Sequence, residues 1–437
     1  MSKELHTADC PFHADLEAFL PDQLGEPGWL SQLRTRAWNA WQASGYPVKG
    51  DEEWLFTPIS AITETTFTRP TTVDAEVFHA GTKRLALPAA LKPSVVFVNG
   101  FALESETSAA QFVQRLKDYN LNPTGLPRLG DLVSESSGGF AALNTAFVED
   151  GAGIVLPEGV TVAEPIVILY ANGGTGAPFV NLRSLLSVGR NSSATIIEIY
   201  TGGANEKYFS NAVTEVHLNE GAQLTHVRIN LESNQAAHIG NTVIQMKRDS
   251  VLSSHNIVLG GKLSRHDVTA RLVDSGASCT INGIYLGHGD QLLDNHTAID
   301  HAAPHCESHE LYKGILGDTA RGVFNGKIFV RLDAQKTDAK QTNQVLLLSP
   351  DARINTKPQL EILADDVKCT HGATVGQLSR EALFYLRSRG IGVNEARAIL
   401  VQAFAGDVLA RIPAPAVRAY LEDLLPSVLP HSPQDGK

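Results

Sequence analysis

The sequence predicts a mainly β protein whose core is a parallel β-helix flanked by N-terminal and C-terminal α-helical domains. Short β-branched runs such as 195–200 (TIIEIY) and 225–230 (THVRIN) alternate with clusters of Gly, Asn, Asp and Ser, as strands and turns do. A polar turn, a small or apolar residue and a strand also recur every 26 to 29 residues, at Ala194, Ala222, Val251, Ala277, Cys306 and Ala334. This period indicates a solenoid whose coils bury their inner side chains against one another. A β-sandwich is the alternative, because strand length alone does not exclude it.

Residues 1–139 are expected to form an N-terminal helical domain and a linker. A first helix is predicted over 15–20, before Pro21. A second is predicted over 29–44, where four apolar residues follow at helical spacing before Gly45 and Pro47 stop it: Leu30, Leu33, Ala37 and Trp41. All four tryptophans, at 29, 38, 41 and 54, fall in this region. Since aromatic side chains dominate core burial, we expect them to anchor this domain.

The β-helix is expected to span residues 140–372, and a C-terminal helical domain residues 373–437. Three helices are predicted in the latter, over 380–389, 395–405 and 415–425, from capping residues and from proline at a helix start. Their boundaries are marked by Ser379 and Gly390, by Asn394 and Gly406, and by Pro415 and Pro426. We expect these helices also to cap the solenoid, which would otherwise expose an open sheet edge.

Composition excludes several classes of protein. Lysine and arginine number 36 against 47 aspartates and glutamates, a net charge of −11 without a long basic block, which disfavours nucleic acid or an anionic membrane as the main partner. The first residues lack the apolar stretch of a signal peptide, and no uncharged apolar run is long enough for a transmembrane helix. We therefore expect a cytoplasmic protein. Its four cysteines, at 10, 279, 306 and 369, would then be free thiols.

No nucleotide-binding or catalytic motif is present in complete form. The segment 322–328 has the Gly and Lys of a phosphate loop, but one spacer is missing and Ile328 stands where Ser or Thr is needed. The glycines of 173–176 lack the third glycine of a dinucleotide-binding turn. Neither G-x-S-x-G nor H-E-x-x-H occurs. The chain is therefore predicted to have no nucleotide site of its own.

Histidines crowd into the segment HTAIDHAAPHCESH, residues 296–309, with His288 just upstream. On a helix, His301, His305 and His309 would share one face like zinc ligands, but Pro304 interrupts such a helix. On a strand, His305 and His309 would point away from Cys306. Three hypotheses stay open for this cluster, which also contains His296: side chains stacked along the coils, a polar interface, or a metal site.

Cys369 and His371 are the strongest candidate ligands. In ADDVKCTHGATVG, residues 364–376, they share one parity with Val367, so on a strand all three face the same way. A thiolate and an imidazole on one face can jointly bind a soft metal, yet iron–sulfur clusters and zinc normally take four protein ligands. The remaining ligands would have to come from elsewhere, for example from another chain.

The residues around this pair resemble the SufB/SufD family of iron–sulfur cluster assembly scaffolds. The match is specific over 322–392, where TKPQLEI, ADDVKCTHGATVG and ALFYLRSRGI are similar to the SufD branch rather than to SufB. A weaker match covers DEEWLFTPI, residues 51–59, and the repeat region. Three positions depart from the family pattern: Lys340, Thr370 and Ser379.

The resemblance implies a right-handed parallel β-helix and two partners. SufB would pair through the β-helix, and SufC, an ABC-type ATPase, would dock on the C-terminal helices and supply ATP hydrolysis. It places His371, supported by Cys369, at the SufB interface where a nascent iron–sulfur cluster forms. It leaves open reduced flavin as an electron source for the complex, and a homodimer in isolation. The alternative function is a purely structural partner that stabilises SufB and positions SufC without ligating iron or sulfur.

Overall fold

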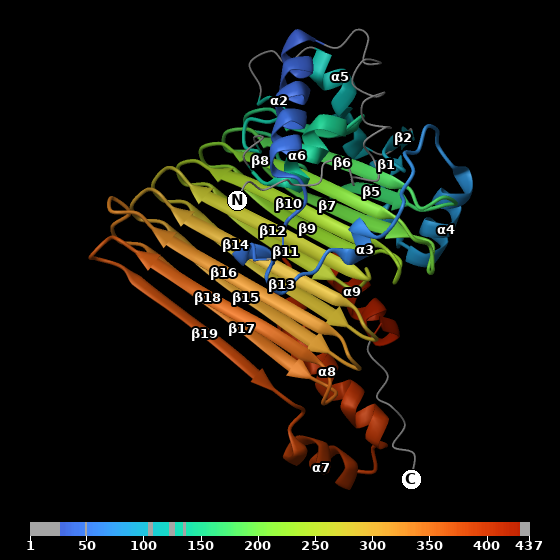
Figure 1. Cartoon of the computed structure of the whole chain (residues 1–437). Helices are drawn as coiled ribbons and strands as arrows, with labels where there is room; N and C mark the ends of the chain where they lie inside the picture. The colour runs from blue at the N-terminus through green and yellow to red at the C-terminus, as the bar shows by residue number, and fades with distance from the viewer. Residues whose placement is uncertain (1–26, 49, 104–107, 122–126, 134–136, 429–437) are drawn as a thin grey trace.

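The computed structural model describes residues 27–48, 50–103, 108–121, 127–133 and 137–428 (Figure 1). Within these residues the strands form two sheets, of ten and nine strands. The ten-stranded sheet contains β1 (Val95–Val98), β2 (Phe101–Leu103), β5 (Ile166–Asn172), β7 (Ser193–Gly202), β9 (Gln223–Leu231), β11 (Val251–Val258), β13 (Ser278–Gly287), β15 (Glu307–Leu316), β17 (Asp338–Leu347) and β19 (Lys368–Gly376). The nine-stranded sheet contains β3 (Val113–Arg115), β4 (Gly151–Leu156), β6 (Phe179–Val188), β8 (Phe209–Leu218), β10 (Ala237–Met246), β12 (Leu263–Leu272), β14 (Leu292–His301), β16 (Arg321–Val330) and β18 (Arg353–Ile362).

The chain winds as a parallel β-solenoid. Successive strands from β4 to β19 alternate between the two sheets, so eight strand pairs, β4–β5 to β18–β19, correspond to about eight coils. Every pairing along this stack is parallel, and the antiparallel pairs in the described residues are β1–β2 and β3–β4 at its first end. The predicted parallel architecture is confirmed and the β-sandwich alternative is wrong, because each coil must stack on the next to bury its inner side chains.

The strand register corrects the period read from the sequence. Backbone hydrogen bonds from each coil to the preceding one make Ala222, Ala277 and Cys306 equivalent, as predicted. The other equivalent residues are Ser192, Ser250 and Thr337, which lie one to three residues from the predicted anchors Ala194, Val251 and Ala334. The spacings are therefore 30, 28, 27, 29 and 31 residues. Turns of unequal length absorb the difference, because turn residues are not constrained by the sheet register.

Alternate side chains of each strand point into the solenoid and stack on the equivalent residues of neighbouring coils. Tyr170 and Tyr200, equivalent residues of β5 and β7, stack with their ring centroids 5.0 Å apart. Many inner positions are nevertheless polar: Glu198, for example, is fully buried and bonds His226 across 2.9 Å. The interior is thus a set of in-register columns, some apolar and some hydrogen-bonded.

Most of the N-terminal helices pack on the first coils, whereas the short helix at residues 52–54 lies against later ones. The described N-terminal helices are α2 (Gly28–Ser44), η3 (Glu52–Trp54), α3 (Ser60–Thr63), α4 (Ala75–Leu85), η4 (Ala89–Leu91), η5 (Ser108–Phe112), α5 (Leu116–Leu121) and α6 (Gly139–Phe147). Helix α2 confirms the prediction over 29–44, and Trp38 packs edge-on against Phe147 of α6 at 5.4 Å. Trp38 and Trp41 are buried as expected, but Trp29 and Trp54 are only half-buried. The helix predicted over 15–20 lies outside the described residues.

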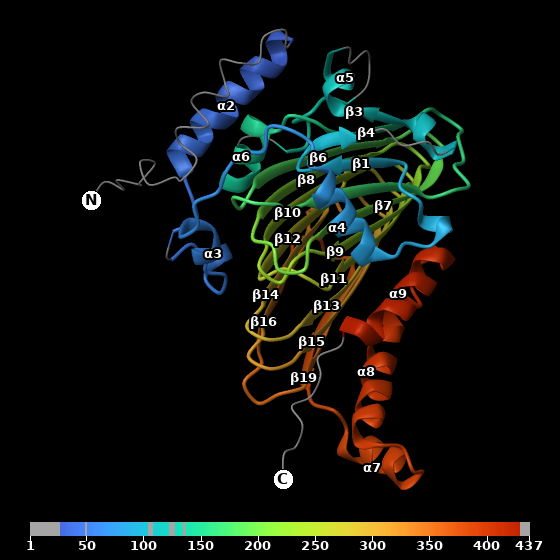
Figure 2. The same cartoon turned by 90° about the vertical axis from the view of Figure 1, so that its right-hand side faces the viewer.

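The C-terminal helices do not cap the solenoid. They are α7 (Arg380–Ser388), α8 (Val393–Leu409) and α9 (Pro415–Val428), and Figure 2 shows α8 and α9 running beside the stack of strands. Helix α8 buries Val401 and Ala405 in one cluster with Leu311 and Ile315. The predicted end-cap is therefore wrong. Outward-facing apolar side chains on β15 offer the surface that an amphipathic helix must bury, whereas β19 is exposed along most of its length.

Two of the three predicted C-terminal helices also have boundaries that differ from the prediction. Ser379 caps α7 as predicted, accepting a hydrogen bond from the Ala382 N–H. Helix α8, however, begins before Asn394 and continues through Gly406 to Leu409, because burial of its last apolar residues outweighs the helix-breaking tendency of glycine. Helix α9 likewise includes Pro426 near its end. Among the described residues, no helix is long and apolar enough to cross a membrane.

Candidate functional site

Cys369 and His371 lie on β19, the last strand of the solenoid. In the parallel register Cys369 pairs with Ala339 and His371 with Gln341, both on β17. Ala339 and Gln341 are buried inside the solenoid, and paired residues of parallel strands share a face. The candidate ligands therefore face the solenoid interior, which the sequence parity alone did not determine.

The pair is accessible because the solenoid ends there. β19 is the outermost strand of its sheet and pairs with β17 alone. Nothing in the described chain stacks on its other side, so Cys369 is half-buried and His371 is exposed. An interior-facing position is thus presented at an open end, where a second molecule can reach it.

The protonation of Cys369 limits what the pair can do by itself. Burial raises the pKa of the Cys369 thiol, and the nearby Asp338 raises it further, against a backbone hydrogen bond from Ala339 that lowers it. The thiol is therefore protonated at neutral pH and must release a proton to bind a soft metal, since the thiolate is the ligand form. Throughout the described residues, no three His, Cys, Asp or Glu side chains are grouped in a way that could hold a metal ion. Among the described residues, this end of the solenoid therefore offers Cys369 and His371 without a third such side chain grouped with them.

The open end also presents backbone and apolar surface. β18 and β19 are the outer strands of the two sheets, so each has one edge of backbone N–H and C=O groups that the described chain does not pair. Leu332 and Leu363, in the turns of the last coils, are 64 % and 58 % exposed, and Val375 of β19 is also exposed. Such an edge is suited to pairing with strands of another chain.

The structure separates the histidines of segment 296–309. His301 points into the solenoid and bonds Ser308 across 2.8 Å, and burial lowers its pKa to about 4. His296, on the same strand β14, points outward. His305 lies in a turn with φ 59°, and Cys306 bonds backbone oxygens of the preceding turn. These side chains do not converge on a metal site. The geometry favours stacking along the coils for His301 and a polar interface for His296.

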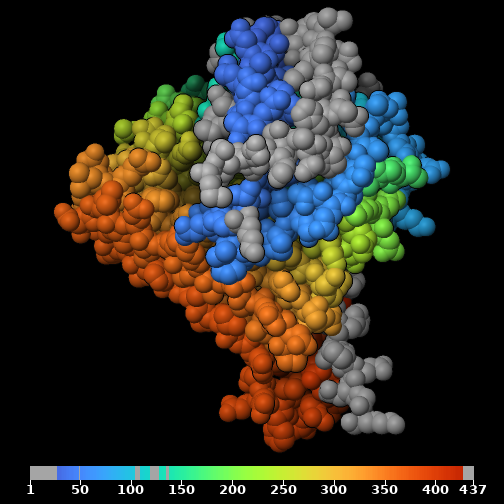
Figure 3. All heavy atoms as spheres, in the orientation of Figure 1, coloured from blue at the N-terminus to red at the C-terminus, as the bar shows by residue number. Residues whose placement is uncertain are grey.

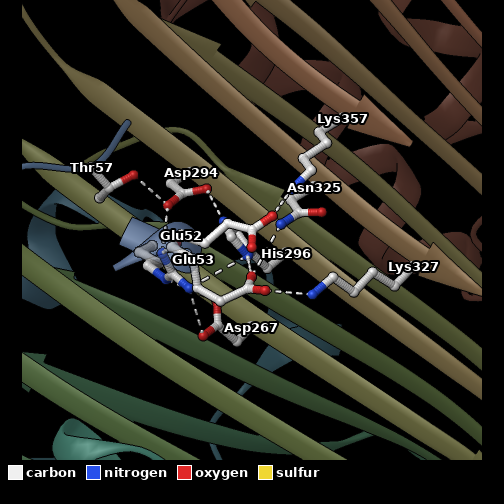
Figure 4. Close-up of polar contacts among 10 residues, drawn as sticks. Glu52, Glu53, Thr57, Asp267, Asp294, His296, Asn325, Lys327 and Lys357 are labelled. Carbon is white, nitrogen blue, oxygen red and sulfur yellow. Dashed lines mark hydrogen bonds and ion pairs between the residues drawn. The ribbon is translucent and has the colours of Figure 1, made fainter. Parts of the chain in front are cut away.

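His296 instead belongs to a polar cluster that the sequence did not predict (Figure 4). Residues 51–57, from the DEEWLFTPI stretch, lie against the outer face of the nine-stranded sheet, and we call them the clasp. Glu53 of the clasp bonds His296 at 3.3 Å and Asn325 at 3.1 Å, and it also pairs with Lys327. Figure 3 shows the N-terminal segment, in blue, against the yellow and orange coils. The clasp thus ties the N-terminal region to successive coils.

The remaining clasp contacts extend this attachment on both sides. Glu52 pairs with Lys357 of β18, the last strand of the sheet. On β12, the Arg265 guanidinium lies 3.8 Å from the Trp54 ring centroid and donates to the Glu53 carbonyl oxygen at 2.6 Å. The clasp therefore spans β12, β14, β16 and β18. In the sequence, only the adjacent Glu52 and Glu53 could have suggested this attachment. The cationic side chains that they contact lie more than 200 residues further along the chain.

Opposite charges fix the protonation states in the clasp. A hydrogen bond from His296, together with Lys327, holds the pKa of Glu53 at about 2 despite burial. Burial lowers the pKa of His296, but Asp294 and Glu53 outweigh it and raise that pKa to about 9. Both groups are therefore charged at neutral pH. The clasp is therefore a fixed network of ion pairs whose side chains are already paired. The Cys369 and His371 side chains, by contrast, remain open to a ligand.

Comparison with known proteins matches nearly the whole chain to two family models. Residues 170–404 match the SUF system FeS cluster assembly, SufBD core domain, and residues 23–168 match the SufBD protein N-terminal region. The chain is 35 % identical to an iron–sulfur cluster assembly SufBD family protein of Synechocystis, covering 86 % of each chain. It is 30 % identical to the iron–sulfur cluster assembly protein SufD of Escherichia coli, over 84 % of this chain and 85 % of that one. The corresponding values for SufD of Bacillus subtilis are 26 %, 92 % and 94 %.

Proposed function

The chain belongs to the SufBD family of iron–sulfur cluster assembly proteins, and from this we propose that it acts as a scaffold subunit that pairs with SufB. In this proposal the open ends of the two solenoids meet, and His371, supported by Cys369, supplies ligands to the nascent cluster at the interface. The cluster is cargo, and it can be released because each chain supplies only some of its ligands. A right-handed winding of the solenoid and a cytoplasmic location, both expected from the sequence, are parts of the same proposal.

The observation that carries this proposal is the exposure of an inward-facing Cys-x-His pair at the last coil. A partner strand added to the edge of β19 would continue the sheet in register. Its inward side chains would then stack on Cys369 and His371, as Ala339 and Gln341 do from the other side. Ligands from two chains would meet inside a continuous interior. Thiolate and imidazole are ligands that suit a soft metal.

The C-terminal helices support the second part of the proposal, that SufC docks on them and hydrolyses ATP. Helix α7 has no buried residue, and Phe384 and Tyr385 are 74 % and 56 % exposed. Two large exposed aromatic side chains on one short helix are typical anchors of a protein interface. Helix α8, which follows α7, is attached to the solenoid through Lys313 of β15. This lysine donates to the Phe404 carbonyl oxygen at 3.0 Å and pairs with Asp407 at 2.8 Å.

The decisive experiment is anaerobic cluster assembly on the complex co-expressed with SufB and SufC. We compare His371→Ala, Cys369→Ser and the matched control Thr370→Ala, which lies between them on the same strand but faces the other way. Iron and acid-labile sulfide per complex are measured, with complex integrity checked by gel filtration. His371→Ala should lower cluster content several-fold in an intact complex, and Cys369→Ser less if the thiol only assists. Unchanged content in His371→Ala would leave the structural-partner function in place of the ligand role.

A further inference from the structure

A column of inward-facing residues leads from the buried interior to His371. In the parallel register Ile281 of β13 pairs with Glu310 of β15, Glu310 with Gln341 of β17, and Gln341 with His371 of β19. Paired side chains of parallel strands stack about 4.8 Å apart on the same face. Glu310 is therefore two strands from His371, with a single amide side chain between them.

Glu310 is a buried carboxyl group whose charge has no counterpart. It is 3 % exposed, and among the described residues no Lys, Arg or His lies within ion-pair distance of it. Its Oε2 accepts a hydrogen bond from the Gln341 Nε2 at 2.8 Å. The Thr297 hydroxyl of β14 lies beside the carboxyl group, but the Glu310 Oε1 is buried without a hydrogen bond of normal geometry. Buried carboxyl groups are normally paired or fully hydrogen-bonded. A carboxyl group kept in this state is a candidate for a functional role.

The amide of Gln341 is directed by this carboxylate. The amide nitrogen of Gln341 donates to the Glu310 carboxyl group, so the amide oxygen faces away from it. The Oε1 of Gln341 is buried and without a hydrogen-bond partner. Gly326 of the opposite sheet makes room for this arrangement, because a Cβ there would lie 2.3 Å from the Gln341 Nε2. The column therefore ends in an unused acceptor next to His371.

We propose that Glu310 and Gln341 are positioning residues for His371. The structure shows no hydrogen bond between Gln341 and His371. In this proposal Glu310 holds the Gln341 amide so that its free carbonyl oxygen can accept the N–H of the His371 imidazole, which leaves the other ring nitrogen to bind iron of the nascent cluster. Histidine ligands almost always donate their second N–H to a carbonyl or carboxylate, and losing that partner typically costs 10- to 100-fold in metal affinity. This role rests on the proposed function of His371 and adds the outer residues that would make it a defined ligand.

The first test reads the imidazole itself and needs no cluster. Ring ¹⁵N shifts of histidine-labelled protein report which nitrogen carries the proton, and the His371 signals are identified by their loss in His371→Gln. In the wild-type protein one tautomer should dominate, whereas Gln341→Leu should show the ratio of a freely exposed histidine. Gln344→Leu is the matched control, because Gln344 lies on the same strand with outward parity.

The second test measures iron and acid-labile sulfide in the complex with SufB and SufC. Gln341→Leu should retain cluster about 10-fold more weakly, and Glu310→Gln should fall between it and the wild-type protein. Unchanged ¹⁵N shifts together with unchanged cluster retention in Gln341→Leu would overturn the positioning role. The two proposals also fail separately. If His371→Ala retains the cluster fully while the tautomer still responds to Gln341→Leu, the positioning contact stands and the ligand role of His371 falls.

Discussion

Replacing Glu310 by glutamine should make the protein more stable, and increasingly so as the pH rises. Burial raises the pKa of Glu310 to about 7, although the Thr297 hydroxyl and the Gln341 amide both lower it, while a carboxyl group in the unfolded chain has a pKa of about 4.3. A carboxyl group whose pKa is higher in the folded than in the unfolded protein stabilises the fold most at a pH below its unfolded pKa. This stabilisation is lost as the pH rises through the folded pKa. At pH 8 the wild-type protein therefore ionises Glu310 at a cost that glutamine avoids.

The size of the effect follows from the two pKa values. Between pH values of about 4.3 and 7, the free energy of unfolding falls by about 1.4 kcal/mol for each pH unit. Relative to a protonated Glu310, the wild-type protein therefore loses about 3.5 kcal/mol at pH 8 and about 1 kcal/mol at pH 5. With about 2.1 cal/mol/K of unfolding entropy per residue, a chain of 437 residues has roughly 0.9 kcal/mol/K. Glu310→Gln should therefore raise the melting temperature by about 4 °C at pH 8 and about 1 °C at pH 5.

Differential scanning calorimetry of both proteins at the two pH values measures this difference. Glu307→Gln is the matched control, because Glu307 is an exposed residue on the same strand, and its effect should be small and independent of pH. A lower melting temperature for Glu310→Gln at pH 8 would refute the reasoning, since it would mean that the carboxylate is stabilised by partners. A more stable variant that retains less cluster would show that Glu310 is kept for function at the expense of stability.

Three further outcomes are expected. Glu53→Gln should destabilise the protein by about 1–1.5 kcal/mol in urea unfolding: the pKa of about 2 corresponds to roughly 3 kcal/mol, and exposure of 44 % of the side chain reduces it. Because the pKa of His296 is raised to about 9, the stabilisation of the fold by this residue should be complete below about pH 6.5 and lost as the pH rises through 9. The decline of the melting temperature over that range should be shallower in His296→Gln. Replacing Phe384 and Tyr385 together by alanine should abolish co-purification of SufC but not of SufB, and retention of SufC would exclude α7 as its anchor.

SufC docking is better tested by substitutions within α7 than by deleting the C-terminal helices. Deleting residues 376–437 would remove α8 as well as α7, and α8 covers apolar side chains on the outer face of the ten-stranded sheet, such as Leu311 and Ile315. Loss of SufC from that deletion would then be hard to separate from aggregation, because the bared apolar patch is itself an interaction surface. Substitutions confined to α7 leave this face covered.

The sequence by itself determined the architecture, because the physical causes of the architecture are local and repeated. β-Branched runs between turn residues specify strands, and their recurrence specifies stacked coils, even where single anchors such as Ala334 were three residues out of register. The Cys369–His371 pair was also visible, since parity on one strand is a property of neighbouring residues. None of these inferences needed a contact between distant parts of the chain.

Tertiary structure decided what the pair faces and what lies around it. The same parity is compatible with burial or exposure, and only the position of β19 at the end of the stack gives an inward-facing yet open site. The column through Glu310 and Gln341 depends on the register of three coils, and the clasp joins Glu53 to Lys327, 274 residues away. Nothing in a local pattern encodes such pairings, because their free energy comes from contacts between coils and exists only when the whole solenoid is wound.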